Sequence, residues 1–233
     1  MTPLKVVAFD LDDTLWHVHP VIVRAEQILR DWLHESVSGF RYDEEKMKTF
    51  REDALREDKS LGYRLTALRR HVIERALLHH LNHDEDAERL SKEAMEVFLV
   101  ARNDVEFFEG ALDAIAEISV VYQLGALTNG NADIRKLGLD KYFSFAFSAE
   151  QVGAPKPAPD LFHRALEHTG CDPHEMLYVG DDPIKDVDAA NQVGLKTIWV
   201  RGAARPEPGD TEADEVIEDI RHLPGAIARL SNC

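Results

Sequence analysis

The stretch Lys5-Val6-Val7-Ala8-Phe9-Asp10-Leu11-Asp12-Asp13-Thr14-Leu15 decides the fold of this 233-residue chain. Its first five residues form an almost continuous apolar run rich in β-branched side chains, which is typical of a strand buried on both faces of a parallel sheet. Acidic residues follow at once. Because ligands of open α/β sheets bind at the carboxyl ends of the strands, the stretch predicts a functional site directly after the first strand.

Four later runs predict further strands of the same sheet. They are Tyr122 to Leu127, Phe145 to Ser148, Met176 to Val179, and Lys196 to Val200. Helical patterns alternate with these runs, which is the sequence pattern of β-α-β units. We therefore expect an α/β fold whose core is a doubly wound parallel sheet.

The segment from residue 16 to residue 106 has a different pattern, in which amphipathic helical spacing replaces the strand-like runs. Pro20 is expected at the first position of one helix, and Asp43 at the N-cap of the next. Apolar stripes predict packing faces at Ile22, Ala25, Leu29, Trp32 and Leu33, at Leu65, Leu68, Val72 and Ala76, and at Ala87, Leu90, Ala94, Val97 and Ala101. We interpret residues 16–106 as an inserted cap domain of four helices, and residues 1–15 and 107–233 as the core domain.

The composition argues against several classes of protein. A net charge of −16, from 43 acidic and 27 basic residues, repels a phosphate backbone, so no nucleic-acid partner is expected. No run approaches the roughly 20 apolar residues of a membrane span, and residues 1–5 do not have the pattern of a secretory leader, so we expect none. Cys171 and Cys233 lack the spacing of a disulfide framework or a zinc site. We expect a cytoplasmic monomer or homodimer with no membrane partner, and a linker from Gly202 to Asp210 around Pro206 and Pro208.

Asp10 and Asp12 form the first group of candidate site residues. Side chains two residues apart in an extended chain project to the same side, so the two carboxylates converge. Carboxylates this close repel each other unless a cation lies between them or one of them holds a proton. Mg²⁺ suits such a site because it prefers hard oxygen ligands and keeps water and substrate oxygens in its octahedron.

A second acidic cluster, Gly180 to Asp186, follows the predicted strand Met176 to Val179. Within it, Asp182 precedes Pro183, so this carboxylate either caps the following helix or binds a metal ion. With Asp10 and Asp12 available from a neighbouring strand, metal binding is the favoured interpretation of the cluster.

Two further elements offer groups that suit a phosphate. Thr128 and Asn129 end another predicted strand and present a hydroxyl and an amide. Lys156 lies between Pro155 and Pro157, which hold the backbone extended and give the ammonium a fixed direction. A metal ion and a fixed cation reverse the local potential even in an acidic protein, so a small phosphorylated metabolite is the expected partner.

In this order, the D-x-D-x-T, T-N, K-P and G-D-x-x-x-x-D elements resemble the four motifs of the haloacid dehalogenase superfamily. The resemblance implies a Rossmann-like catalytic core with a helical cap, Mg²⁺ as cofactor, and hydrolysis of a phosphate monoester. It makes Asp10 the nucleophile and Asp12 the general acid and base, with the Asp12 backbone carbonyl as a metal ligand. Asp181 matches a further metal ligand, and Asp186 the acid that orients metal-bound water.

The same resemblance assigns Thr128, Asn129 and Lys156 to the phosphate. It also separates the branches of the superfamily. Dehalogenases lack an acid at the position of Asp12, because a halide leaves without a proton. Sugar phosphomutases usually have glycine where this chain has Asp13. Hydrolysis is therefore expected, with a phosphomutase, a 2-haloacid dehalogenase and a catalytically silent binding module as alternatives.

The closest resemblance is to bacterial phosphatases that act on FMN and on phosphorylated riboflavin precursors. The segments Phe9 to Leu15, Pro20 to Ile22, Thr128 to Ala132 and Val179 to Asp182 carry it. It implies FMN, a riboflavin precursor or a nucleotide as substrate. Three residues just after the nucleophile loop are candidates for contacts with the leaving group: His17, His19 and Arg24.

Overall fold

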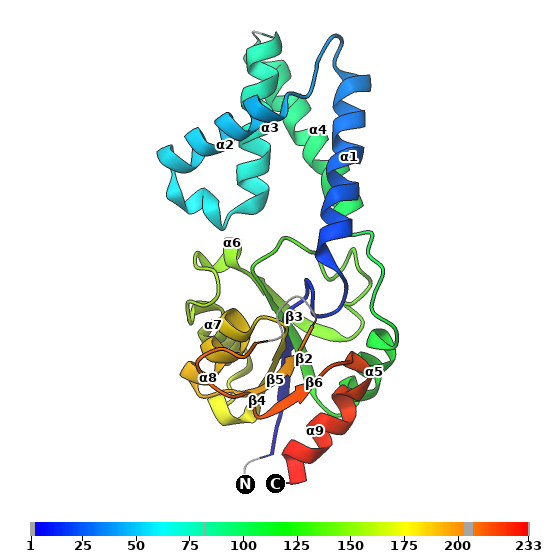
Figure 1. Ribbon diagram of the computed structural model, residues 1–233, viewed down its shortest axis with the longest axis vertical. Coiled ribbons are helices and arrows are strands. Elements are labelled where there is room, and N and C mark those ends of the chain that lie inside the picture. The colour runs from blue at the N-terminus through cyan, green and yellow to red at the C-terminus, as the bar shows by residue number, and fades with distance from the viewer. Residues whose placement is uncertain (1–2, 82, 203–206, 233) are drawn as a thin grey trace. The chain divides into compact units, whose positions relative to one another are not determined.

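The chain forms two compact units in the computed structural model, which describes residues 3–81, 83–202 and 207–232 (Figure 1). Residues 1–18 and 106–233 make up one unit, which we call the core unit. Residues 19–105 make up the other, which we call the cap unit.

A six-stranded sheet, parallel throughout, is the centre of the core unit. Its strands, in the spatial order β3-β2-β1-β4-β5-β6, are Phe143–Ser148, Gln123–Thr128, Val6–Phe9, Met176–Gly180, Lys196–Val200 and Glu215–Ile217. The predicted doubly wound sheet is confirmed. The sixth strand was not predicted, because its three residues include an exposed valine and are too few to show a pattern.

Helices cover both faces of this sheet, with α7 and α8 on one side and α5 and α9 on the other (Figure 1). The helices and short helical turns of the core unit are α5 (Ala111–Ser119), α6 (Ala149–Val152), α7 (Asp160–Thr169), η2 (Pro173–Glu175), η3 (Pro183–Asp188), α8 (Ala189–Val193), η4 (Ile220–His222) and α9 (Leu223–Asn232). Helix α5 lies in the connection from β1 to β2, whereas α7 and α8 lie in the connections from β3 to β4 and from β4 to β5, which run across the sheet in the opposite direction. Right-handed crossovers in opposite directions place their helices on opposite faces.

The register of the central strands places the site. Phe9, at the end of β1, pairs with Ala126 of β2 and with Val179 of β4. All three strands therefore end near the same level. Side chains that follow them in sequence meet at one edge of the sheet.

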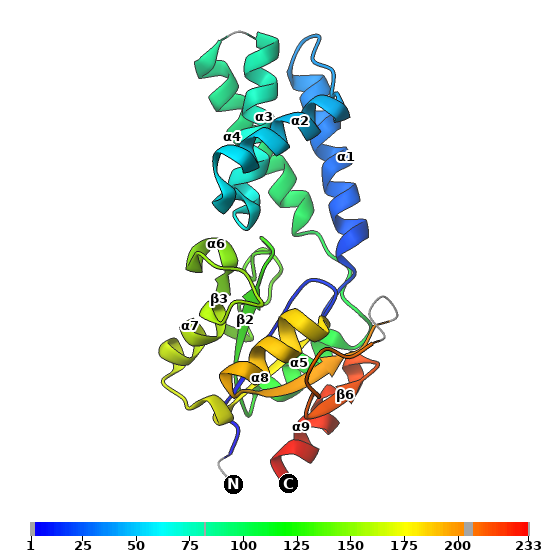
Figure 2. The ribbon, with the colours of Figure 1, turned by 60° about the vertical axis from the view of Figure 1, so that its left-hand side comes forward.

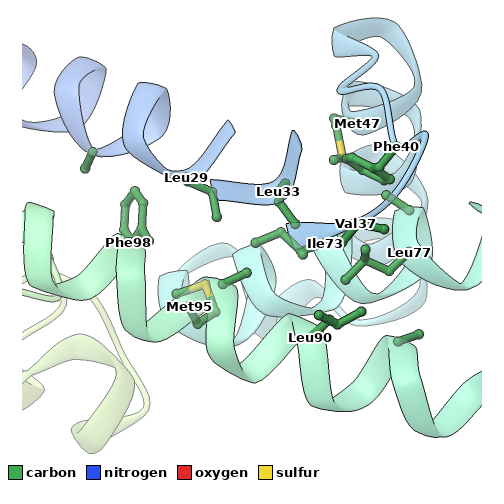
Figure 3. Close-up of a cluster of buried hydrophobic side chains, with 14 of the residues drawn as sticks. Leu29, Leu33, Val37, Phe40, Met47, Ile73, Leu77, Leu90, Met95 and Phe98 are labelled. Atoms are coloured by element: carbon green, nitrogen blue, oxygen red, sulfur yellow. The ribbon is translucent and has the colours of Figure 1, made fainter. Parts of the chain in front are cut away.

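The cap unit consists of α1 (Val18–Ser36), α2 (Glu44–Glu57), the short turn η1 (Lys59–Gly62), α3 (Leu65–Leu81) and α4 (Asp84–Arg102). Helices α3 and α4 lie side by side in both views (Figures 1 and 2). Their apolar faces and that of α1 enclose a hydrophobic cluster (Figure 3). This cluster contains Leu29, Leu33, Val37, Phe40, Met47, Ile73, Leu77, Leu90, Met95 and Phe98.

Two details of the cap helices can be compared with their predictions. Asp43 caps α2 as predicted, since its side chain accepts a hydrogen bond from the Lys46 N–H at 3.1 Å. The prediction for Pro20 was wrong by two residues. Helix α1 begins at Val18, and Pro20 lies in the first turn, where its missing N–H leaves no intrahelical bond unmade.

The predicted linker lies partly outside the described residues, which stop at Gly202 and resume at Glu207. Its far end is anchored: the buried Asp188 carboxylate accepts hydrogen bonds from the backbone N–H of Asp210 and from both the N–H and the hydroxyl of Thr211.

Cys171 is half-buried with a free thiol, and Cys233 falls outside the described residues. Within the described chain, no helix has the length and apolar character needed to span a membrane.

Candidate active site

A cavity of about 130 Å³ opens at the carboxyl ends of β1, β2 and β4. It is lined by Asp10, Asp12, Asp13, Thr128, Asn129, Gly130, Lys156, Asp181, Asp182, Lys185 and Asp186. Every residue that the sequence assigned to the nucleophile, the metal and the phosphate is in this wall. The four motifs, which span residues 10 to 186, therefore meet around one space.

Three carboxylates form a cluster within this wall. Oxygen atoms of Asp10, Asp181 and Asp186 lie within 4.8 Å of one another, and these residues are only 8 %, 7 % and 1 % exposed. Buried oxygens so arranged are the ligand set that a hard divalent cation prefers. The donor set therefore fits Mg²⁺.

Two hydrogen bonds hold Asp181 in this cluster. The Thr14 hydroxyl donates to Asp181 Oδ1 at 3.2 Å, and Trp199 Nε1 donates to the Asp181 carbonyl at 2.9 Å. Neither Thr14 nor Trp199 was predicted as a site residue. Thr14 follows the two acids within the first motif, whereas nothing in the sequence connects Trp199, on β5, to the metal ligands.

The Asp12 carboxylate lines the same cavity and is held by a tryptophan. Its Oδ1 accepts a hydrogen bond from Trp16 Nε1 at 3.0 Å, and Trp16 is fully buried with its ring edge-on to Phe107 at 5.5 Å. A carboxylate that lines the cavity and is held by a buried tryptophan suits proton transfer. The assignment of the Asp12 backbone carbonyl to the metal stays a prediction.

Lys156 is the cation of the cluster. Its ammonium is fully engaged, with Nζ 2.7 Å from Asp10 Oδ1, 2.7 Å from Asp186 Oδ1 and 2.6 Å from the Tyr178 hydroxyl. Its backbone is held as well. The Asn129 amide accepts from the Lys156 N–H at 2.7 Å and donates to the Lys156 carbonyl at 2.9 Å. The Asn129 side chain, predicted to hold phosphate, thus fixes the loop that carries the lysine.

The charges of this cluster act on one another. Burial raises the pKa of Asp10 well above its ordinary value; Lys156 lowers it, and the carboxylates of Asp186 and Asp181 raise it further. Burial alone lowers the pKa of Lys156, but Asp10 and Asp186 outweigh burial and raise it, so the ammonium stays charged. With all three carboxylates ionised against one ammonium, the cluster carries an excess of negative charge, which a bound divalent cation would compensate.

The turn after β4 places Asp186. A Cβ atom at Gly180 would lie 2.4 Å from the Asp186 carboxylate, so only glycine leaves room for that group. Asp186 Oδ2 accepts from the Asp182 N–H at 2.9 Å. Of the two roles open to Asp182, the structure shows capping, because its Oδ1 accepts from the N–H groups of Ile184 and Lys185 at the start of the π-helical turn η3.

The three candidates for leaving-group contacts lie outside the wall of this cavity. His17 is exposed, with its ring edge-on to Phe108 at 4.6 Å. His19 and Arg24 belong to the cap unit, where Arg24 donates to the Asp104 carbonyl and pairs with its carboxylate. Their contact with a substrate stays a prediction.

Comparison with known proteins places these motifs in a family. The sequence model described as "haloacid dehalogenase-like hydrolase" matches residues 4–194. A 5-amino-6-(5-phospho-D-ribitylamino)uracil phosphatase of Escherichia coli is 30% identical over 208 residues, which cover 89% of this chain and 86% of the relative. A glyceraldehyde 3-phosphate phosphatase of Methanopyrus kandleri is 26% identical and covers 98% and 99%. A crystal structure described as a 2-haloacid dehalogenase from Pseudomonas syringae is 38% identical with a TM-score of 0.92, covering 97% of this chain and 99% of the other. The chain belongs to the haloacid dehalogenase-like hydrolases.

Proposed function

We propose that this hydrolase is a Mg²⁺-dependent phosphatase that cleaves a small phosphorylated metabolite through an aspartyl-phosphate on Asp10. The observation that carries the proposal is the presence of a second acid, Asp12, in the wall of the cavity beside the nucleophile. An alkoxide leaving group needs a proton and the attacking water must lose one. A single carboxylate beside the reacting centre serves both steps.

The first step begins at Asp10. A carboxylate oxygen of Asp10 attacks phosphorus in line, the new O–P bond forms as the ester P–O bond breaks, and Asp12 protonates the departing oxygen. In the second step Asp12 takes a proton from water, which attacks the aspartyl-phosphate and releases inorganic phosphate. Trp16 Nε1 keeps the Asp12 carboxylate oriented through both steps.

Asp10, Asp181 and the Asp12 carbonyl would hold Mg²⁺, with Asp186 beside them. When bound, the ion supplies positive charge that offsets the negative charge of the transferring phosphoryl oxygens. Thr128 and Gly130 also line the cavity; the Thr128 hydroxyl accepts from the Gly130 N–H at 2.9 Å and retains its own proton for a phosphate oxygen.

A 2-haloacid dehalogenase is the second candidate, because the Pseudomonas syringae structure carries that description at 38% identity. Dehalogenation needs a nucleophilic carboxylate, which Asp10 supplies. Its first step has no use for an acid at Asp12, since a halide departs without a proton. The second acid, together with the uncompensated negative charge of the carboxylate cluster, favours the phosphatase.

For the substrate we propose a phosphorylated riboflavin precursor, FMN or a nucleotide. The support is the sequence identity with the Escherichia coli phosphatase, whose name specifies a ribitylaminouracil phosphate. A phosphomutase would transfer the phosphoryl group back to a sugar phosphate, so product analysis separates it from a hydrolase. A silent binding module would release no phosphate from any of these compounds.

The test compares two leaving groups on the same preparation. With Mg²⁺, the protein is expected to release phosphate from nitrophenyl phosphate and, with higher catalytic efficiency, from one of the proposed metabolites. Chelator should stop both reactions, and Ca²⁺ should restore them poorly because its larger, looser shell misaligns the attack. Chloride release from 2-chloropropionate without phosphatase activity would overturn the proposal in favour of the dehalogenase.

A further inference from the structure

The ammonium of Lys156 has a partner that the proposed mechanism does not use. A lysine ammonium carries three N–H donors. Two of them reach the carboxylates of Asp10 and Asp186, and the third reaches the Tyr178 hydroxyl at 2.6 Å. Tyr178 is 1% exposed and is not among the residues that line the cavity. It therefore touches the lysine and not the substrate.

The phenol is itself fixed from two sides. Its ring lies edge-on to Phe162, with ring centres 4.9 Å apart. Its hydroxyl has two acceptors within reach, the Leu127 carbonyl at 3.0 Å and Asp186 Oδ1 at 3.4 Å, and the shorter contact is the one to Leu127. With its single O–H donated to either of them, the oxygen keeps a lone pair for the Lys156 N–H. Burial raises the pKa of Tyr178 well above its ordinary value, so the phenol is a neutral acceptor.

A neutral acceptor suits this position. A further carboxylate at this position would add negative charge to a cluster that already contains three carboxylates, whereas a phenol takes a hydrogen bond and leaves the positive charge of Lys156 for Asp10 and Asp186. Lysine has a flexible four-carbon stem, so an ammonium with a free N–H can turn toward water or a phosphate oxygen in the cavity.

We infer that Tyr178 is a positioning residue of this enzyme: its hydroxyl takes the third N–H of Lys156 and holds the ammonium between Asp10 and Asp186. The inference rests on the proposed function for its kinetic consequence, but the contact itself does not. Asn129 fixes the backbone of the lysine and Tyr178 fixes its ammonium, so residues of β4 and of the loop after β2 together determine where the positive charge lies.

The kinetic test is Tyr178→Phe, which keeps the ring against Phe162 and removes only the hydroxyl. With nitrophenyl phosphate and Mg²⁺ we expect kcat to fall about tenfold, while KM and the inhibition constant of inorganic phosphate stay within about twofold. Tyr142→Phe is the matched control, because Tyr142 lies in the same unit with Lys141 Nζ 4.7 Å from its ring centre. This control should keep the wild-type kcat.

A second readout works without any activity. In ¹H–¹⁵N spectra of lysine ammonium groups, the buried Lys156 should give a slowly exchanging signal, assigned by its loss in Lys156→Arg. Tyr178→Phe should shift or broaden that signal and leave the other lysines unchanged, even if the phosphatase proposal fails. An unchanged ammonium signal, an unchanged kcat, or a fall in kcat matched by a lower unfolding temperature and a higher KM would each overturn the positioning role.

Discussion

At the scale of single residues, the chemistry depends on how Asp10 is held. Lys156 pairs with one of its oxygens at 2.7 Å, and the carboxylates of Asp181 and Asp186 lie close by. Burial disfavours the charged form of Asp10, whereas the ammonium favours it. Lys156 therefore opposes the burial and the neighbouring carboxylates, which together raise the pKa of Asp10 above its ordinary value.

Asp10→Asn should abolish turnover and preserve the fold. The amide has nearly the shape of the carboxylate, and its oxygen still accepts from Lys156, but it does not attack phosphorus. We expect the kcat for nitrophenyl phosphate to fall by about 10³ or more, with the unfolding temperature within a few degrees of wild type. A correctly folded variant that keeps more than a tenth of the activity would exclude Asp10 as nucleophile.

Tyr178 illustrates why a site residue can be found from the structure and not from the sequence. Asp10, Asp12 and Asp181 were predictable because a charged group at the end of an apolar strand has few structural reasons to be there, and Lys156 because prolines flank it on both sides. Tyr178 lies inside an apolar run, where a tyrosine is ordinary core. Its significance arises from a 2.6 Å contact with a lysine 22 positions away in sequence, and strand periodicity carries no information about such a contact.

At the scale of elements, the junction of β4 and η3 decides where Asp186 lies. The carboxylate fills the space beside Gly180, and the Asp182 N–H fixes one of its oxygens at 2.9 Å. The first residues of η3 are held by the Asp182 cap. Strand, turn and helical start thus position one acid against Lys156.

Gly180→Ala should displace Asp186 and impair the enzyme without touching a reactive group. An added Cβ at 2.4 Å from the carboxylate forces the side chain or the turn to move. We expect at least a tenfold fall in kcat, measured with nitrophenyl phosphate, and a lower unfolding temperature. Gly202→Ala is the control, because a Cβ there meets no atom of the described residues within 4 Å and the position should tolerate alanine. Equal activity of both variants would contradict this account of the turn.

The strands could be predicted more fully than the helix faces. Strands β1, β2 and β4 are buried almost throughout, so their sequences are apolar almost throughout. In α3 the predicted stripe included Leu65 and Val72, but Ile73 and Leu77 are buried instead, whereas Leu65 and Val72 are partly exposed. Helix α3 packs against both α2 and α4, so its buried residues do not form the single stripe from which a face is predicted.

At the scale of the whole molecule, the chain passes between its two units at residues 18–19 and 105–106. The two chain segments that lead to and from the cap unit lie side by side inside the core unit. There Trp16 forms an isolated antiparallel bridge with Phe107, and the Phe108 N–H donates to the Leu15 carbonyl at 2.8 Å. The cap unit has its own hydrophobic cluster. Both facts support the prediction that the core unit still folds when a short linker replaces the cap unit.

Replacing residues 19–105 by a short glycine-serine linker should therefore keep the core folded and retain Mg²⁺-dependent hydrolysis of nitrophenyl phosphate. Selectivity among larger metabolites should be lost, because the insert that would distinguish leaving groups is gone. The measurement is the ratio of kcat/KM for a metabolite to that for nitrophenyl phosphate in both proteins. An unchanged ratio in the capless protein would refute a role for the cap in specificity.

The central claim is that Asp12 acts twice, as acid when the leaving group departs and as base when water attacks. Asp12→Asn keeps the oxygen that accepts from Trp16 Nε1 and removes the proton transfer. Nitrophenolate leaves without a proton, so this variant should form the aspartyl-phosphate at a near-normal rate and break it down about 10² times more slowly or worse. Rapid mixing with nitrophenyl phosphate should then give a burst of one nitrophenolate per active site, followed by a slow phase, with phosphate retained on the protein. An alkyl phosphate should give no burst. If nitrophenyl phosphate gives none either, and its steady rate falls as far as that of the alkyl ester, then Asp12 is not the shared acid and base.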